Sequence, residues 1–297
     1  MLHPNALRIR VRAAGVNRAD LLQAAGHYPP PPGTSDILGL ECAGEVIEAG
    51  GDVRGFVRGD RVMALLAGGG YAEEVVVDAG SAMHVPDALS DVEAAAIPEV
   101  FLTVFLTVFD LARAQRGETL LVHGGGSGIG TAATTLAKLN DMRVIVTAGS
   151  DEKCARCLEH GADIAINYIA EDFAEKAKEV DIVLDHIGAP YLPRDLQVLA
   201  TGGRVVIIGS MGGRGSAEID VGRLLGKRQQ IISSTLRSRS IEDKAHLVAA
   251  FLARFGDDLR AGRVRPVIDS VFPIAAVAEA HRRMDGSEHF GKVVLTI

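Results

Sequence analysis

From about residue 119 onward, short apolar runs rich in β-branched residues alternate with amphipathic stretches of helical period. The predicted strands are Thr119–His123, Arg143–Thr147, Ile164–Asn167, Asp181–Asp185, Arg204–Ile208 and Gln230–Ser234. The predicted helices are Gly128–Leu139, Glu152–His160, Glu171–Glu179, Tyr191–Leu199 and Val221–Leu225. Apolar strands that alternate with helices are typical of right-handed βαβ units. The pattern therefore predicts an α/β fold with a Rossmann-type, doubly wound parallel sheet.

The first part of the chain has a different pattern. Short β runs at Ala6–Ala13, Glu45–Glu48, Arg61–Leu65 and Glu74–Val77 are separated by glycine-rich turns, which predicts an antiparallel, barrel-like domain. The tail predicts a helix at Ala275–Met284 and a final strand at Lys292–Thr296, and we expect it to return to this first domain. The predicted boundaries are 1–97 with 264–297 for the β domain and 98–263 for a nucleotide-binding domain.

Composition excludes several classes of protein. The 297 residues include 31 Lys+Arg and 38 Asp+Glu, a net charge of −7, which argues against nucleic acid as a partner. The longest apolar run, Ala94–Phe109, is interrupted by Pro98 and Glu99 and is too short to span a bilayer, so no membrane partner is expected. Three cysteines are too few for a disulfide framework and favour a reducing, cytoplasmic location. The arginine-rich start also occurs in mitochondrial transit peptides, but its alternation favours a strand followed by a loop.

The strongest motif is an apolar strand followed by GGGSGIG at 124–130 and a helix. Glycines in such a turn let backbone amides approach a pyrophosphate, and the helix N-terminus favours its charge. The predicted cofactor loop comprises Gly125, Ser127, Gly128, Ile129 and Gly130. The alternative is a tight turn without a ligand. The short-chain dehydrogenase family is excluded, because none of the four tyrosines has a lysine four residues later.

The end of the second strand indicates which dinucleotide binds. NAD-binding proteins place a carboxylate there to accept the ribose hydroxyls, whereas this strand ends in Ala148, Gly149 and Ser150. We expect Ser150 and Lys153 to bind a 2′-phosphate and Asp151 to cap the following helix. The predicted cofactor is therefore NADPH.

Several stretches outside the glycine loop resemble the medium-chain dehydrogenase/reductase superfamily. Within it, they are most similar to the zinc-free, NADPH-dependent quinone oxidoreductases of the stress-inducible type. These stretches are AGVNRADLLQ (14–23), YPPPPG (28–33), ILGLECAGEV (37–46), GDRVMALL (59–66), AAAIPEVFLTVF (94–105), LRSRS (236–240) and FGKVVLTI (290–297). The resemblance implies a GroES-like domain beside the Rossmann domain. Compared with the family, the chain is expected to be shortened at its N-terminus.

The resemblance also implies that no metal is bound. The zinc branch of the superfamily has cysteine where this chain has Asn17 and histidine where it has Leu40. Zinc sites take about four N, S or O ligands, and a structural zinc loop would need a cluster of cysteines that this chain lacks. Cys154 and Cys157 form a CxxC on a predicted helix, with no second pair, and we interpret them as packed side chains.

By the same resemblance, catalytic roles are expected for Asn17 and Tyr28, with Asp20 supporting their loop. Thr103 is expected to contact the nicotinamide, and Tyr168 the 2′-phosphate. The remaining predicted cofactor residues, besides Tyr28 itself, are Gly209, Ser210, Met211, Leu236, Arg237, Ser238, Phe290 and Lys292. Arg237 is equally compatible with a surface charge. His123 is expected to be structural. Tyr28 is expected either to donate a proton or to stack, and a proton-relay role is left open for His27.

The function that these observations predict is hydride transfer from NADPH to a quinone or an α,β-unsaturated carbonyl compound, without metal. One alternative is a 2-enoyl thioester reductase of the same superfamily. Another is a non-catalytic NADPH-binding dimer. Zinc-free relatives commonly pair through the last Rossmann strand, so a homodimer through Gln230–Ser234 is expected by analogy.

Overall fold

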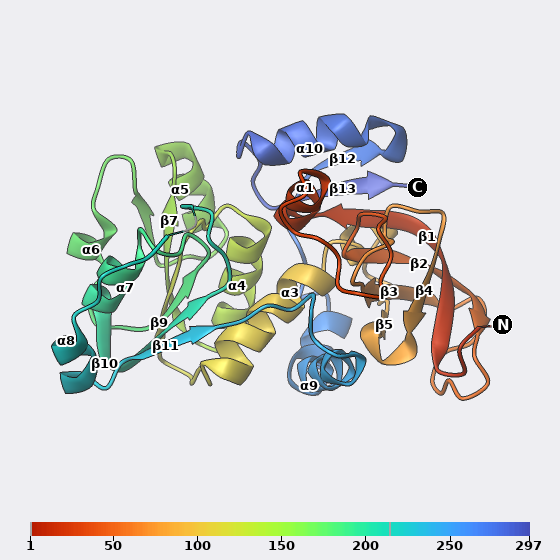
Figure 1. Ribbon diagram of the computed structural model, residues 1–297, viewed down its shortest axis with the longest axis horizontal. Helices are drawn as coiled ribbons and strands as arrows, with labels where there is room; N and C mark the ends of the chain where they lie inside the picture. The colour runs from red at the N-terminus through yellow and green to blue at the C-terminus, as the bar shows by residue number, and fades with distance from the viewer. Residues whose placement is uncertain (1, 214) are drawn as a thin grey trace. The chain divides into compact units, whose positions relative to one another are not determined.

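The computed structural model describes residues 2–213 and 215–297 (Figure 1). The chain forms two compact units, each with its own sheet. The first unit comprises the chain up to Leu102 together with Leu236–Ile297, and the second comprises Thr103–Thr235. The sequence pattern predicts these boundaries at residues 97 and 263. The segment between 236 and 263 belongs to the first unit because helix α9 (Ile241–Arg260), which is absent from the predicted elements, packs against the 3-10 turn η1 (Ala79–Ser81).

The second unit is built around a six-stranded parallel sheet in the order β11-β10-β9-β6-β7-β8. Its strands are β6 (Thr119–Val122), β7 (Arg143–Ala148), β8 (Ile164–Asn167), β9 (Val180–Asp185), β10 (Leu199–Ile207) and β11 (Gln230–Ser233). Its helices are α4 (Gly128–Leu139), α5 (Asp151–Glu159), α6 (Phe173–Lys176), α7 (Leu192–Val198) and α8 (Val221–Gly226), with a π-helical turn η2 (Phe105–Leu111) that continues α3 (Pro98–Val104). The predicted Rossmann-like parallel sheet is confirmed.

The order of this sheet positions the glycine loop. The strand order changes direction at β6, which lies between β7 and β9. Ligands of open parallel sheets bind outside the carboxyl ends of the strands at such a switch point. The core beneath it is apolar because the strands are covered on both faces, and it includes Leu121, Ile145, Val183 and Val205. The glycine loop therefore follows the central strand, at the edge where a dinucleotide is expected.

The first unit contains a seven-stranded sheet in the order β12-β13-β1-β2-β3-β5, with β4 also pairing β1. Its strands are β1 (Ala6–Val16), β2 (Glu41–Ala49), β3 (Arg61–Leu65), β4 (Glu74–Asp78), β5 (Ala82–His84), β12 (Ile268–Pro273) and β13 (Lys292–Thr296). All pairs are antiparallel except β12 with β13. The expected GroES-like domain is confirmed, but its expected barrel is corrected to an open sheet: among the described strands, β12 and β5 form its ends and do not pair.

Short helices complete the first unit. They are α1 (Arg18–Ala24), α2 (Asp91–Ala94), α10 (Val277–Asp285) and the 3-10 turn η3 (Ile274–Ala276). The predicted strand Ala6–Ala13 extends to Val16 and is followed by α1, where the sequence analysis expected a loop. Helix α1 begins here because Asp20 Oδ2 accepts the backbone N–H of Asn17 at 2.8 Å, which satisfies a donor at the helix start. None of the described helices has the length and apolar character needed to cross a membrane.

Candidate active site

The five predicted loop residues come together in one turn at the start of α4. Ser127 caps the helix, and its side chain accepts the N–H of Gly130 at 3.0 Å. Within the described residues, the backbone N–H groups of Gly128 and Ile129 have no acceptor. Two free donors at the positive end of a 12-residue helix form a site for an anion.

The glycines of this loop have different physical roles. A Cβ atom at Gly125 would lie 2.6 Å from the Val146 side chain, and one at Gly130 would lie 2.4 Å from the Gly124 carbonyl oxygen. Gly125 is therefore glycine because the loop packs against β7, and Gly130 because the loop backbone folds closely against it. Gly128 is partly exposed and is the first residue of α4.

The residues predicted to bind the 2′-phosphate also come together, at the end of β7. Ser150 caps α5 by accepting the N–H of Lys153 at 3.2 Å, so the prediction that Asp151 is the cap is corrected. The Tyr168 hydroxyl lies 2.9 Å from the position that a Cβ at Gly149 would take, so the phenol lies over that glycine. The Asp151 carboxylate accepts a hydrogen bond from Asn167 at 2.8 Å. The end of β7 thus combines the hydroxyl groups of Ser150 and Tyr168 with Lys153. The nearby Asp151 carboxylate is already hydrogen-bonded to Asn167.

Gly209, Ser210 and Met211 follow β10, as predicted. The N–H of Met211 donates to the His186 carbonyl at 2.9 Å, which packs this loop against the one that follows β9. Thr103 is the first residue of the second unit, and its carbonyl accepts the Thr107 hydroxyl at 2.7 Å. Leu236, Arg237, Ser238, Phe290 and Lys292 lie in the first unit.

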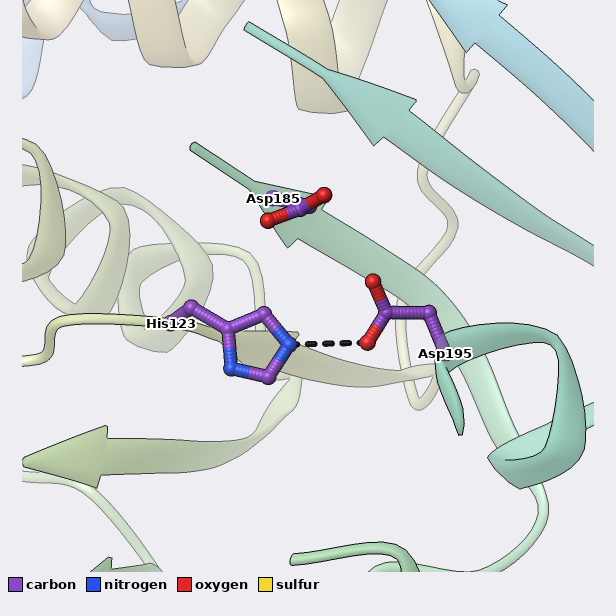
Figure 2. A group of neighbouring side chains, drawn as sticks. All are labelled: His123, Asp185 and Asp195. Atoms are coloured by element: carbon purple, nitrogen blue, oxygen red, sulfur yellow. Dashed lines mark hydrogen bonds and ion pairs between the residues drawn. The ribbon is translucent and has the colours of Figure 1, made fainter. Parts of the chain in front are cut away.

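A buried polar group lies directly before the glycine loop. His123 Nε2 and Asp195 Oδ1 are 2.8 Å apart, and Asp185 lies beside them (Figure 2). His123 Nδ1 is also 3.1 Å from Thr147 Oγ1. Burial lowers the pKa of His123 to about 4 and raises that of Asp195 to about 8. Burial also raises the pKa of Asp185 to about 6. All three side chains are fully buried. At neutral pH His123 is therefore neutral and Asp195 protonated, whereas Asp185 keeps its charge, and we interpret the group as a hydrogen-bonded network that fixes the end of β6.

This group is also the one set of His, Cys, Asp and Glu side chains in the described chain whose ligand atoms converge. Both ring nitrogens of His123 are already used by Thr147 and Asp195. The carboxylate of Asp185 accepts the backbone N–H groups of Ile187 and Gly188. A metal ion there would have to displace these hydrogen bonds from a site closed to solvent.

A second buried polar cluster, in the first unit, contains Asn17, Glu41 and Lys292. The ammonium of Lys292 donates to Asn17 Oδ1 and Glu41 Oε1, each at 2.6 Å, and to the Val16 carbonyl at 3.1 Å. Asn17 Nδ2 donates to Glu41 Oε1 at 2.9 Å and makes a long contact of 3.4 Å with the Gly15 carbonyl. One amide N–H of Asn17 therefore makes only a weak hydrogen bond. All three hydrogen bonds of the Lys292 ammonium, by contrast, go to residues of this unit.

Asp20 holds the loops around this cluster together. Its carboxylate is fully buried and accepts the N–H of Asn17, the N–H of Gly39 at 3.0 Å and the Tyr71 hydroxyl at 3.1 Å. Burial raises its pKa to about 6 despite these donors. Asp20 therefore links α1 to the segment before β2 and to the segment after β3.

Arg237 and Tyr28 lie against each other. The guanidinium of Arg237 is 5.2 Å from the centre of the Tyr28 ring and donates to Ala67 O at 2.8 Å and to Gln23 Oε1 at 2.7 Å. Arg237 is only 3% exposed, so its charge orders the loops of the first unit. Burial raises the pKa of the Tyr28 hydroxyl above its usual value of 10. Leu236 and Phe290 are likewise buried in this unit.

The buried cluster around Asn17 and Lys292 also includes Glu41 and Glu99, for which the sequence predicts no role. Glu41 Oε2 accepts the backbone N–H of Glu99 at 2.8 Å. Burial, together with the Glu41 charge, raises the pKa of Glu99 to about 8. A signal was present in the sequence, because Glu99 is the single acid in the apolar run Ala94–Phe109 and a buried carboxylate is costly unless it has a use.

Comparisons with known proteins identify the family. Residues 3–87 match the alcohol dehydrogenase GroES-like domain, and residues 160–295 match the zinc-binding dehydrogenase family. Quinone oxidoreductase from Homo sapiens is 31% identical over 297 residues, which cover 97% of this chain and 88% of the human protein. The chain belongs to the medium-chain dehydrogenase/reductase superfamily.

Two solved structures are similar to this superfamily member over the whole chain. The quinone oxidoreductase of Thermus thermophilus, solved alone and with NADPH, is 32% identical with a TM-score of 0.81, covering 100% of this chain and 93% of that one. A structure described as an NAD-dependent alcohol dehydrogenase is also 32% identical, with a TM-score of 0.85 and the same coverage. These two relatives thus differ in the nicotinamide cofactor that their descriptions name. This superfamily member is therefore an NAD(P)H-dependent oxidoreductase of a small-molecule substrate.

The residues present do not fit the zinc ion that one family name implies. The position where oxygen atoms of Asn17 and Glu41 converge is filled by the Lys292 ammonium. A lysine at 2.6 Å from both oxygens supplies the positive charge that a metal would bring, and it blocks the approach of one. We therefore derive no catalytic step through zinc.

Proposed function

We propose that this protein reduces quinones or α,β-unsaturated carbonyl compounds with NADPH and without a metal. The observation that carries the proposal is the end of β7, where Ser150, Lys153 and Tyr168 gather beside a glycine loop with two free amides, and where the strand itself ends without a carboxylate. The quinone substrate is supported by the oxidoreductases named above, which resemble the chain over nearly its full length.

The chain's own residues have three tasks in this reaction. The amides of Gly128 and Ile129 bind the pyrophosphate. Ser150, Lys153 and Tyr168 bind the 2′-phosphate and so select NADPH. The bound nicotinamide supplies a hydride. Asn17, oriented by Glu41 and Lys292, directs its weakly held N–H to the oxygen on which negative charge develops. No residue needs to form a covalent bond.

Substrate class is tested by steady-state kinetics. NADPH oxidation at 340 nm is measured with a naphthoquinone, an enone and a crotonyl thioester. The proposal expects turnover of the quinone or the enone at a higher kcat/KM than of the thioester. The reverse order would favour a 2-enoyl thioester reductase. Saturable NADPH binding without turnover of any of the three would favour a non-catalytic binding protein.

The cofactor preference leads to a mutational prediction. Lys153→Ala removes a charged partner of the 2′-phosphate, and such contacts contribute about 1.5–3 kcal/mol. We therefore expect NADPH to bind roughly 10–100-fold more weakly while NADH binding changes little. Fluorescence titration with both cofactors measures this difference. Lys176→Ala, on the exposed side of α6 in the same unit, is the control and leaves both affinities unchanged. An equal loss for both cofactors would contradict the assignment.

We further propose that the protein is a homodimer. Strand β11 is an edge of the parallel sheet, pairs only with β10 among the described strands, and exposes Ile231. Exposed strand edges favour pairing with a second copy. Light scattering is expected to give the mass of a dimer for the wild type and of a monomer for Ile231→Lys. The control Leu158→Lys, at an exposed position of α5, stays dimeric. A monomeric wild type would refute the proposal.

A further inference from the structure

The polar cluster of the first unit contains one carboxyl group without a hydrogen-bond partner. Glu99 Oε2 is buried, and none of the described residues donates to it. Such an atom costs folding free energy, and in native structures it marks a strained, catalytic or ligand-binding group. The residue as a whole is only partly buried.

Glu99 is linked to both residues for which catalytic roles are expected, Asn17 and Tyr28. Its backbone N–H donates to Glu41, whose other oxygen holds Asn17. The charge of Glu99 is also, after burial, one cause of the raised pKa of Tyr28. Thr103 follows one turn later in α3 and therefore projects from the same face of that helix.

We propose that Glu99 is the general acid of the reaction and that its carboxyl group donates the proton that accompanies the hydride. This inference rests on the proposed function. The substrate gains two electrons and one hydrogen as hydride from the nicotinamide. The O–H bond of Glu99 breaks, and a new O–H bond forms on the quinone oxygen or a new C–H bond on the enone α-carbon. The resulting carboxylate is reprotonated from solvent.

The charges around Glu99 match this role. The groups that face it come from five other segments: Glu41 on β2, Lys292 on β13, Asp20 on α1, Lys244 on α9 and Tyr28 in the loop after α1. Burial and the two carboxylates raise the pKa of Glu99 to about 8, against the opposing effect of the two lysines. The carboxyl group is therefore protonated at neutral pH, as a donor must be. Because the pKa of Tyr28 lies above 10, its phenol is a much weaker acid.

The test compares the wild type with Glu99→Gln, which keeps the shape of the side chain but has no acidic proton. General acids contribute about 10²–10⁴-fold to rate, so kcat for enone reduction is expected to fall at least about 100-fold. NADPH affinity, measured by fluorescence, is expected to stay the same. The wild-type kcat is expected to fall as pH rises through about 8, because Glu99 loses its proton there. This dependence should be absent from the residual activity of Glu99→Gln.

A readout independent of turnover is the side-chain carbon-13 NMR spectrum of glutamate-labelled protein. One resonance is expected to titrate near pH 8 and to vanish in Glu99→Gln. Glu99→Asp, which retains an acid, should recover part of the rate. The exposed Glu48→Gln is the control for removing a carboxylate and should change neither measurement.

Failure of this inference is distinct from failure of the proposed function. If the wild type turns over the enone or quinone and Glu99→Gln does so equally well, only the role of Glu99 is overturned. A Glu99 resonance that titrates in the ordinary glutamate range would also overturn it. If the wild type reduces none of these substrates, the proposed function fails, and the inference fails with it.

Discussion

Lys292→Met is expected to destabilise the first unit by about 3–5 kcal/mol, the usual cost of removing one partner from a buried ion pair. The substitution leaves the fully buried Glu41 carboxylate without its counter-ion and Asn17 Oδ1 without its donor. Because proteins are stable by only about 5–15 kcal/mol, such a loss should open this unit at much lower urea concentrations.

The cysteines allow each unit to be followed separately. Cys42 is buried in the first unit, whereas Cys154 and Cys157 are buried in the second. Thiol labelling at increasing urea, resolved by mass spectrometry, should show earlier labelling of Cys42 in Lys292→Met and an unchanged profile for Cys157. The double variant Glu41→Gln with Lys292→Met removes both charges and should recover part of the loss. A Cys42 midpoint equal to that of the wild type would show that the pair contributes little.

Gly128→Val is expected to weaken NADPH binding by roughly 100-fold or more, about 2.7 kcal/mol. The physical reason is steric: this partly exposed glycine opens α4 beside the free amides, where the pyrophosphate backbone must approach closely. A branched side chain would occupy that space. Fluorescence titration with NADPH measures the loss, and calorimetry checks that the variant remains folded.

The matched control is Gly226→Val at the end of α8. Apart from its chain neighbours and the backbone of its own helix, no described atom lies within 4 Å of the position of a Cβ there, so the same substitution is accommodated in the same unit. It should leave NADPH affinity unchanged. Undiminished binding by Gly128→Val would mean that the loop is only a tight turn between a strand and a helix.

The parallel sheet and the glycine loop could be predicted from the sequence because their signals are local. Strand β8 and helix α4 have the predicted bounds, since the apolar runs and the flanking turn residues define them within a few positions. The long helix α9 was missed, although its Phe251 and Phe255 are spaced for one buried face. Its membership of the first unit depends on contacts with η1, more than 150 positions earlier in the sequence.

The buried cluster of Asn17, Glu41 and Lys292 could not be predicted from local sequence signals. Glu41 bonds to Asn17 across 24 positions and to Lys292 across 251 positions. Only the pairing of β1 with both β2 and β13 brings these three side chains together. The sequence by itself determined the fold class, the glycine-rich loop and the absence of a carboxylate at the end of β7, because each depends on neighbouring residues. The tertiary structure decided that Lys292 neutralises buried oxygens and that Glu99 has an unpartnered oxygen among the described residues, because burial and charge pairing depend on residues that are distant in the chain.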